Sequence, residues 1–464
     1  CLLIAVIVVY LSYWNSLSLQ ATNLANGARY EPAECWFKKP VSIKTECGYM
    51  TTRKEGTESA SFKLPVVVLR HSQWKNSESP MLHISGGPGG PAFIDAESMV
   101  YWVENFRAQN WGVDFVLYDQ RGTGLSQPFL DCPDSREARL ESFKKPLTAS
   151  EDSLEFTEHM QRCYEQLAKS ANTVSHLSAI STKHSSEDIA DLHDLLGAKQ
   201  WVLMGVSYGT RLALDFVKRF PEKVHSLVLD SVYPPEFDGF EVMIENGFKG
   251  IDKILENCAS DATCEALFPH LPKKLHQALS LLAESPLLLV SKGDSTLTSQ
   301  AVLLTAHRLI LLLDYVSYDS RLFREVPAAI SAVLDRNSNH QSLLKLANNY
   351  LKIELFDQFS EAVYMITECK ENGRFDVPSL YKRIQPYREK YPMLDWSPQG
   401  IYSPEVCRSW LKDPSSSSQP YRESVTTDKP TLILGGGLDS ITPPERGEYL
   451  STILSNSRYV EYPN

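Results

Sequence analysis

A serine lies between two glycines at the point where an apolar run gives way to a helical pattern. The stretch reads LMGVSYGTRLALDFV, residues 203–217, and its G-x-S-x-G core runs from Gly205 to Gly209. A strand that turns this sharply into a helix brings its backbone too close to its neighbours for side chains, which explains the glycines. The turn also lifts the Ser207 hydroxyl above a sheet and directs the Tyr208 N–H, at a helix N-terminus, toward the same point. The pattern predicts an α/β sheet with a nucleophile at one edge.

Short β-branched runs bounded by turn residues recur in two blocks, with helical patterns between them. Several runs are apolar at consecutive positions, as expected for parallel strands buried on both faces. Helical patterns cover 185–198, which starts with Ser and acidic residues, and 208–220, which Pro221 ends. Because strands and helices alternate, we expect right-handed crossovers. The predicted strands are 64–71, 80–85, 114–119, 199–206, 224–232, 430–437 and 457–463.

The chain of 464 residues is long enough for two or three domains, but one core with an insertion explains the pattern more economically. From residue 236 to 425 the pattern is mostly helical, and a serine-rich stretch at 412–424 is predicted to be a surface segment. The predicted division is therefore a first core part at 30–235, a helical cap at 236–425 and a second core part at 426–464.

The first residues form an apolar run of about fourteen, shorter than the roughly 20 residues that span a bilayer. Small and polar residues follow, so residues 1–21 are predicted to be an export signal, with a retained membrane anchor as the alternative. Because the chain begins with Cys1 and lacks a basic n-region, we expect it to be clipped at its N-terminus. The formal charge of −11 argues against a nucleic-acid partner.

Eight of the nine cysteines remain when Cys1 is set aside, an even number. Disulfides in an oxidising compartment, periplasmic or extracellular, follow from this count. Metal binding is the competing use of cysteine, but no C-x-x-C pair or histidine cluster has the spacing of metal ligands. Spacing suggests four pairs, although the sequence alone does not fix the connectivity: Cys35 with Cys47, Cys132 with Cys163, Cys258 with Cys264, and Cys369 with Cys407.

Two further motifs follow predicted strands. In HISGGPGGP, 83–91, the glycines leave backbone N–H groups uncovered, and Gly87 is predicted to supply the second donor of an oxyanion hole. An ordinary Gly/Pro loop is the alternative. In YDQRGTGLSQP, 118–128, Asp119 and Arg121 are expected to brace the loops around the site, an architectural role that we favour over direct catalysis.

A hydroxyl that attacks a carbonyl needs a base, and the base needs a carboxylate to orient it. In LILGGGLDSITPP a strand runs into a Gly-rich turn and then Asp439, the expected place for that carboxylate; an N-cap for the helix after Pro443 is the alternative. All eleven histidines precede Asp439, and the sequence ends at YVEYPN, where the loop carrying the base is expected to begin. We therefore expect the triad histidine to lie beyond Asn464, and the printed chain alone to be nearly inert.

These motifs, in this order, resemble the α/β-hydrolase fold and, within it, the prolyl iminopeptidase and tripeptidyl aminopeptidase group of serine exopeptidases. SGGPGG, DQRGTGLS and GVSYGT are similar to that group's H/P-G-G-P-G-G, D-x-R-G-x-G-x-S and G-x-S-Y-G-x motifs. The likeness covers residues 60–235 and 428–464, and MITECKE with VCRSW extends it weakly into the helical region. Ser85 stands where prolyl iminopeptidases have His, which favours the tripeptidyl type.

The resemblance implies a mostly parallel sheet with a large helical cap inserted after strand 6. It assigns the site as nucleophile Ser207, triad acid Asp439, and oxyanion donors Tyr208 and Gly87. An aminopeptidase must also recognise a free α-ammonium group, and a partly desolvated carboxylate is the physical means. Glu371, placed like the family's acidic residue after Cys369, and its neighbour Glu368 are the candidates, with a solvated helix face as the alternative.

The leading hypothesis is an exported serine aminopeptidase that releases short peptides or single residues from peptide N-termini through an acyl-enzyme. An esterase or lipase is the alternative, because fold and triad do not set the leaving group. A non-catalytic, hydrolase-like binding protein is a third hypothesis, supported only by the missing histidine. The chemistry needs no cofactor, and no stable membrane partner is expected unless the N-terminal segment is kept as an anchor.

Overall fold

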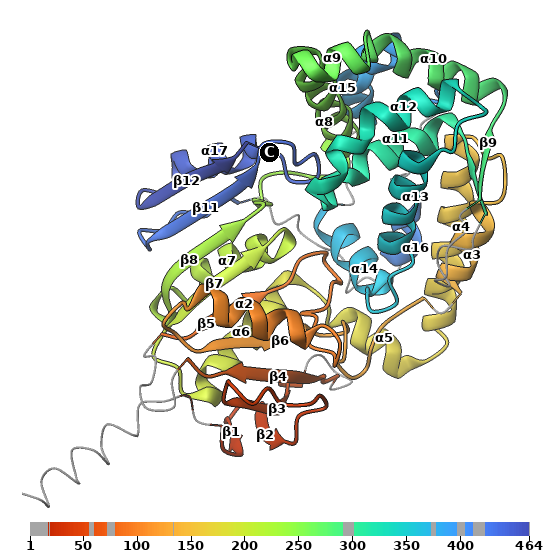
Figure 1. Ribbon diagram of the computed structural model, residues 1–464. Coiled ribbons are helices and arrows are strands. Elements are labelled where there is room, and N and C mark those ends of the chain that lie inside the picture. The colour runs from red at the N-terminus through yellow and green to blue at the C-terminus, as the bar shows by residue number, and fades with distance from the viewer. Residues whose placement is uncertain are drawn as a thin grey trace, which may run out of the picture.

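The computed structural model describes residues 17, 19–54, 60–71, 79–132, 134–290, 301–372, 377–396, 404–411 and 423–463. Within them, ten strands form one sheet in the order β1-β2-β3-β4-β6-β5-β7-β8-β11-β12 (Figure 1). The six strands from β6 to β12 in that order run parallel, and β1 to β4 pair antiparallel. The strands are β1 Thr22–Asn23, β2 Arg29–Ala33, β3 Thr45–Thr51, β4 Lys63–Leu69, β5 Met81–Ile84, β6 Phe115–Tyr118, β7 Trp201–Val206, β8 Val224–Asp230, β11 Thr431–Gly436 and β12 Ser457–Tyr462.

Each of the seven predicted strands corresponds to a strand of this sheet, but β4 departs from the parallel pattern that its sequence suggested. Its apolar run, residues 64–69, is buried on both faces, and it pairs antiparallel with β3 and with β6. Val66 and Val68 pack into one core cluster, whereas Val67 and Leu69 pack into another. A run of consecutive apolar residues therefore indicates that a strand is buried on both faces, but it does not indicate whether the strand pairs parallel or antiparallel.

Helices cover both faces of the sheet. On one face α2 contributes Trp102 and Phe106 to a core cluster with residues of β4 and β6. On the other face lie α6, which Ser181 caps at its start and Gly197 ends, α7 and α17. The helices of this part are α2 Met99–Gln109, α3 Ser135–Ser142, α4 Ala149–Leu167, α5 Ala171–Ser178, α6 Thr182–Leu196, α7 Tyr208–Arg219, η1 Pro221–Lys223 and α17 Pro444–Ile453.

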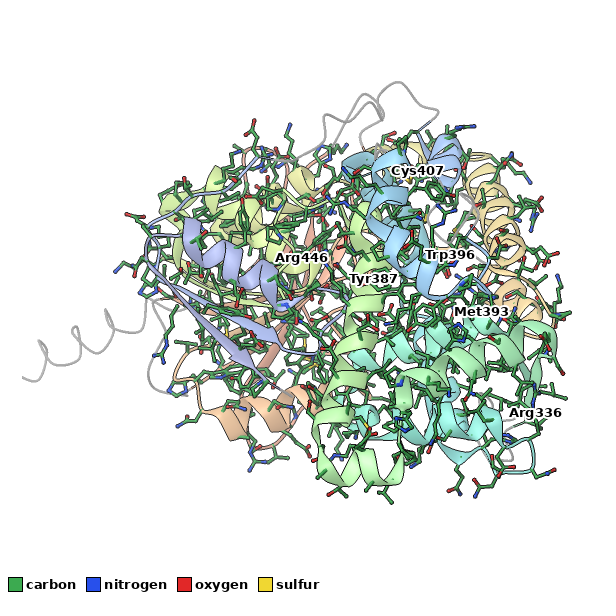
Figure 2. All side chains as sticks on the ribbon, turned by 90° about the horizontal axis from the view of Figure 1, so that it is seen from above. Arg336, Tyr387, Met393, Trp396, Cys407 and Arg446 are labelled. Atoms are coloured by element: carbon green, nitrogen blue, oxygen red, sulfur yellow. A yellow bond between two sulfur atoms is a disulfide. The ribbon has the colours of Figure 1, made fainter. Side chains whose placement is uncertain are left out.

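Between β8 and β11 the chain forms a layer of helices with its own apolar core, the upper right part of Figure 1. Phe248 of α8 stacks on Tyr387 with 4.8 Å between ring centroids, and it also meets Trp396. Tyr387 and Trp396 are labelled in Figure 2. The domain boundaries predicted above stay a prediction. The elements of the layer are α8 Gly239–Ser260, α9 Ala262–Leu267, α10 Leu271–Glu284, β9 Leu287–Val290, β10 Ala301–Leu304, α11 Ala306–Asp314, η2 Tyr315–Tyr318, η3 Ser320–Glu325, α12 Val326–Leu334, α13 Gln341–Glu354, α14 Glu361–Asn372, α15 Val377–Lys390 and α16 Pro404–Trp410.

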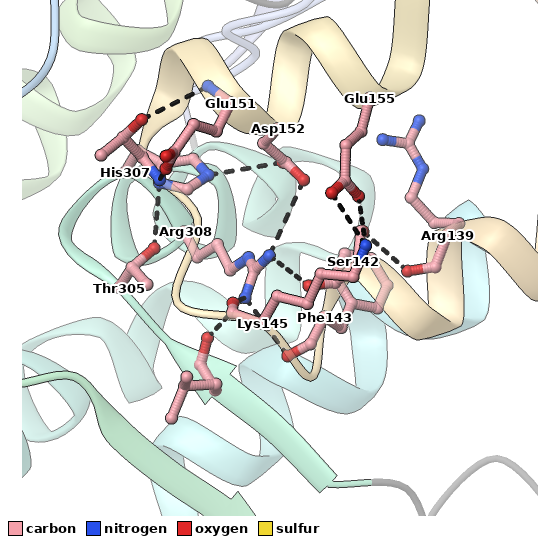
Figure 3. Close-up of polar contacts among 12 residues, drawn as sticks. Arg139, Ser142, Phe143, Lys145, Glu151, Asp152, Glu155, Thr305, His307 and Arg308 are labelled. Carbon is pink, nitrogen blue, oxygen red and sulfur yellow. Dashed lines mark hydrogen bonds and ion pairs between the residues drawn. The ribbon is translucent and has the colours of Figure 1, made fainter. Parts of the chain in front are cut away.

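A polar cluster joins this layer to α3 and α4 (Figure 3). Arg308 of α11 is 2% exposed in its side chain and donates to the carbonyl oxygens of Ser142 at 2.6 Å and Lys145 at 2.8 Å. These carbonyls lie in the last turn of α3 and just after it, where a helix leaves acceptors unsatisfied. His307 lies 3.4 Å from the Asp152 carboxylate of α4. The helical layer is therefore fixed to the segment that follows β6 by a buried cation and its acceptors.

The four predicted disulfides are all present: Cys35–Cys47, Cys132–Cys163, Cys258–Cys264 and Cys369–Cys407. Cys407 of α16 carries the last of them (Figure 2), beside Trp410, which is fully buried. Most of the predicted signal, residues 1–16, and most of the serine-rich segment, residues 412–422, lie outside the described residues. None of the described helices has the length and apolar character needed to cross a membrane.

Candidate active site

Ser207 occupies a strained turn between β7 and α7. Its φ is 54° and its ψ is −123°, a conformation that costs a residue with a Cβ about 1–3 kcal/mol. The flanking glycines are required by close approach: a Cβ at Gly209 would lie 2.1 Å from the carbonyl oxygen of Ile84, and one at Gly205 would lie 2.5 Å from the carbonyl oxygen of Gly209. The turn predicted from G-x-S-x-G is therefore present, with the serine at its apex.

The backbone on both sides holds the serine in place. Ser207 N–H donates to the carbonyl of Asp230, the last residue of β8, at 2.9 Å, and Thr210 N–H donates to the Ser207 carbonyl at 2.9 Å. Tyr208 is the first residue of α7, so its N–H has no acceptor within the helix. Its phenol bonds to the Thr182 hydroxyl at 2.7 Å, which fixes the side chain away from this N–H. The position at the start of α7 agrees with an oxyanion donor, and the donor role of the Tyr208 N–H stays a prediction.

The glycine-rich loop after β5 lies against the serine. A Cβ at Gly86 would be 2.9 Å from the Ser207 Cβ and 3.3 Å from its Oγ. Gly90 N–H returns to the Gly86 carbonyl at 3.2 Å, and Gly87 between them has a φ of 114°. The loop is a tight turn that presents backbone next to the hydroxyl. The donor role of Gly87 stays a prediction.

Asp119 and Arg121 brace the surrounding loops, as expected. The Asp119 carboxylate, 1% exposed, accepts the N–H of Ala92 at 2.6 Å and that of Leu125 at 2.7 Å, so one side chain joins the loops that follow β5 and β6. Burial raises the pKa of Asp119 to about 6, and these two N–H donors oppose the rise. Arg121 instead points to the buried carboxylate of Asp188 in α6.

Asp439 follows β11, which pairs with β8, which in turn pairs with β7. Because these strands are parallel, their carboxyl ends meet at one edge of the sheet (Figure 1). Ser207 directly follows β7 and Asp439 lies three residues after the end of β11, so both lie at that edge. The carboxylate accepts from Ile441 N–H and Thr442 N–H, each at 2.9 Å, and from the Thr442 hydroxyl at 2.8 Å. It thereby closes its own turn, while the N-cap of α17 is Pro443, with no side-chain hydrogen bond.

None of the eleven histidines forms a hydrogen bond with Ser207 or Asp439 within the described part of the chain. His83 is buried against Trp102, with 4.8 Å between ring centroids, and burial lowers its pKa to about 4. Burial, with the charges of Arg121 and Lys370, lowers the pKa of His184 to about 3. Both rings are therefore neutral structural groups at pH 7, and a triad histidine beyond residue 464 stays a prediction.

The two candidate carboxylates of α14 differ in their surroundings. Glu371 Oε1 accepts from the N–H and hydroxyl of Thr182, and its Oε2 lies 3.5 Å from Nη1 of Arg211. Burial raises the pKa of Glu371 and the Arg211 charge opposes the rise. Arg211 is fully buried four residues after the nucleophile, and sequence reasoning missed it. Its positive charge compensates the negative charge of Glu371.

Glu368 forms no ion pair within the described residues. Its Oε2 accepts from the Asn372 amide at 2.6 Å and from the Tyr233 hydroxyl at 3.4 Å. Burial raises its pKa to about 7, although the charge of Arg211 opposes the rise. Tyr233 N–H in turn bonds to Thr210 Oγ1 at 2.8 Å, so this carboxylate is linked to the first turn of α7. A buried carboxylate with only neutral donors can accept a cation.

Comparison with known protein families agrees with this fold. A family model of the alpha/beta hydrolase fold matches residues 79–284, and a model described as TAP-like protein matches residues 391–464. The chain has the α/β-hydrolase fold. Within it, this α/β hydrolase is closer to the tripeptidyl aminopeptidase type than to the prolyl iminopeptidases.

Curated relatives align with parts of this α/β hydrolase. The putative hydrolase YuaR of Escherichia coli strain K12 is 26% identical over 294 residues, 60% of this chain and 56% of that protein. The tripeptidyl aminopeptidase of Streptomyces coelicolor is 28% identical over 222 residues, 46% of this chain and 39% of that protein. Serine protease Hip1 of Mycobacterium tuberculosis is 23% identical over 393 residues, 80% of this chain and 72% of that protein. The chain thus spans about half the length of the first two relatives.

Proposed function

We propose that the full-length protein is an exported serine aminopeptidase that releases short peptides or single residues from peptide N-termini. The observation that carries the proposal is the juxtaposition of the strained Ser207 turn, the Gly86 backbone and the Asp439 loop at one sheet edge. Ser207 attacks the scissile carbonyl, and the N–H groups of Tyr208 and Gly87 stabilise the oxyanion, each by about 2.7–4 kcal/mol. The rest of the peptide leaves as the amine, and water then hydrolyses the acyl-enzyme and regenerates Ser207. The likeness to a tripeptidyl aminopeptidase and a serine protease supports peptides as substrates.

Export is supported by the disulfides. Four disulfides hold the described residues, and such bonds persist in periplasmic or extracellular compartments and are rare in the cytosol. The apolar N-terminal run agrees with this placement.

Glu368 is our candidate for recognising the substrate's α-ammonium. Glu371 already faces the guanidinium of Arg211, whereas Glu368 has two neutral donors. A buried carboxylate gains most from a cation that arrives with the substrate, because its charge is otherwise uncompensated. An aminopeptidase can in this way prefer a free amino group to a blocked one.

Paired substrates test the proposal. We expect the full-length enzyme to cleave a peptide arylamide with a free N-terminus at least about tenfold faster, in kcat/KM, than the same peptide acetylated at its N-terminus. Glu368→Gln is expected to remove most of this preference and to leave hydrolysis of a p-nitrophenyl ester, which carries no ammonium, within about twofold. Equal cleavage of free and acetylated peptides would favour an esterase or endopeptidase instead. A parallel loss of ester hydrolysis in the variant would show that Glu368 is structural.

The pKa of Glu368 gives the pH dependence a sign. Since burial raises this pKa to about 7, the free carboxyl is protonated and neutral at lower pH and charged at higher pH. KM for the free-amine peptide is therefore expected to fall as pH rises through about 7, and to rise again above about 8, where the α-amino group loses its proton. KM for the aryl ester should show neither the fall near pH 7 nor the rise above pH 8. A KM for the peptide that stays flat from pH 6 to 7.5 would contradict the assignment.

A further inference from the structure

The residue after the proposed triad acid is held by the helical layer. Ser440 Oγ donates to Asp314 Oδ1 at 2.5 Å and lies 2.7 Å from the Ser317 hydroxyl oxygen. Asp314 is the last residue of α11, and Ser317 belongs to η2. Two side chains of the layer therefore bond to the loop that carries Asp439.

The turn that contains Asp439 needs an external anchor. The carboxylate of Asp439 bonds to Ile441 and Thr442, which belong to the same turn, so these bonds set its shape and leave its position to other contacts. Ser440 is 4% exposed and lies within this turn. Its bonds to the helical layer thus act on the turn as a whole.

Helix α8 closes the space around these groups. A Cβ at Gly250 would lie 2.6 Å from the Ser440 Cβ, and one at Gly247 would lie 3.2 Å from the Asp314 carboxylate. Packing this close leaves Ser440 no room to move toward α8. The loop is therefore held by hydrogen bonds on one side and by helix backbone on another.

The surroundings of the Asp314 carboxylate suggest that it does more than stabilise the fold. Within the described residues it forms no ion pair, and its hydrogen-bonding partner is the neutral Ser440 hydroxyl. Asp314 is half-buried, so its carboxylate is partly desolvated beside a neutral partner, which costs free energy that an apolar residue of similar size would not. The bond to Ser440 is therefore explained more simply by the position that it gives the turn than by a gain in stability.

We propose that Asp314 is a positioning residue that acts through Ser440 to fix the turn carrying Asp439. The inference rests on the proposed role of Asp439 as the acid that orients the catalytic base. Catalysis then depends on how the helical layer packs against the sheet, because α8 and α11 set the position of the turn and therefore of the Asp439 carboxylate. The layer then contributes to the reaction itself as well as to the recognition of substrate.

Four substitutions in the full-length protein test the inference, with hydrolysis of a p-nitrophenyl ester as the readout because it requires the triad and no ammonium site. Asp314→Ala and Ser440→Ala are expected to lower kcat by about 10- to 100-fold, with KM within about twofold, because a displacement of the order of 1 Å in a catalytic group has this effect. Gly250→Ala should act likewise by pushing Ser440 away. Asp314→Asn should retain kcat within about threefold, since its amide oxygen can still accept from Ser440.

Asp319→Ala is the matched control, because Asp319 lies five residues further along and pairs with Arg321 instead of Ser440. It should leave kcat unchanged. The inference is overturned if Ser440→Ala and Asp314→Ala keep kcat within twofold, or if Asp314→Asn falls as far as Asp314→Ala, which would assign the effect to charge. If Asp314→Ala does not fold, Ser440→Ala and Gly250→Ala decide.

The outcomes separate this inference from the proposed function. If the enzyme hydrolyses the ester but does not prefer free amino groups, the aminopeptidase proposal is refuted. The positioning role of Asp314 is then still tested by kcat for the ester in the variants. Wild-type protein that hydrolyses neither substrate refutes both.

Discussion

Ser207→Ala is expected to lower kcat/KM of the full-length enzyme by at least about 10³-fold for peptides and esters alike, because no acyl-enzyme can form. The loss should appear without loss of fold. Alanine and serine both carry a Cβ, so the strain of a φ of 54° is the same for each, and stability should stay within about 1 kcal/mol. The measurement is steady-state hydrolysis, combined with labelling by a fluorophosphonate that reacts only with an activated serine.

Ser231 supplies a matched control for this experiment. It also has a positive φ, 56°, and it follows β8, the strand next to β7. Its hydroxyl lies 3.5 Å from Asp230 Oδ1, the limit of a hydrogen bond, and its N–H donates to Leu434. Ser231→Ala should retain labelling and activity within about threefold. Labelling that persists in Ser207→Ala and disappears in Ser231→Ala would move the nucleophile to position 231.

The features that could be predicted from the sequence are those determined by residues that lie close together along the chain. The turn at Ser207 requires glycines two residues on either side, and the sheet strands are short apolar runs between turn residues. Disulfides between cysteines 6 to 38 residues apart also followed the spacing. In each case the partners are near in sequence, so few alternatives compete.

The contacts that sequence reasoning missed join distant segments. The side chains of Arg121 and Asp188 are 67 residues apart, and Ser440 and Asp314 are 126 apart. A helical pattern shows which face of a helix is apolar, but it does not show which charged residue of another segment will meet that face. Glu371 illustrates the consequence: its position after Cys369 suggested a substrate ligand, and only the fold reveals the guanidinium of Arg211 beside it.

A substitution of Arg121 is expected to have the largest effect on stability of those considered. Arg121 and Asp188 are each 1% exposed in their side chains and form a bidentate pair with distances of 2.7 and 2.6 Å. A third guanidinium bond, of 2.7 Å, reaches the carbonyl of Ala179 at the end of α5. Arg121→Met removes the cation and leaves Asp188 buried and uncompensated, which should cost about 3–5 kcal/mol in the free energy of unfolding.

The double variant Arg121→Met with Asp188→Leu separates the charge from the packing. It removes both ions, so it should regain much of the stability lost in Arg121→Met, because an isolated buried charge costs more than an apolar replacement of the pair. Recovery should be incomplete, since the Ala179 carbonyl still lacks its donor, at a cost of about 1–3 kcal/mol. Thermal and urea unfolding measure both changes. If Arg121→Met alone were as stable as the wild type, the pair would not be bracing the loop after β6 against α5 and α6, and the architectural role of the DQRGTGLS motif would fail with it.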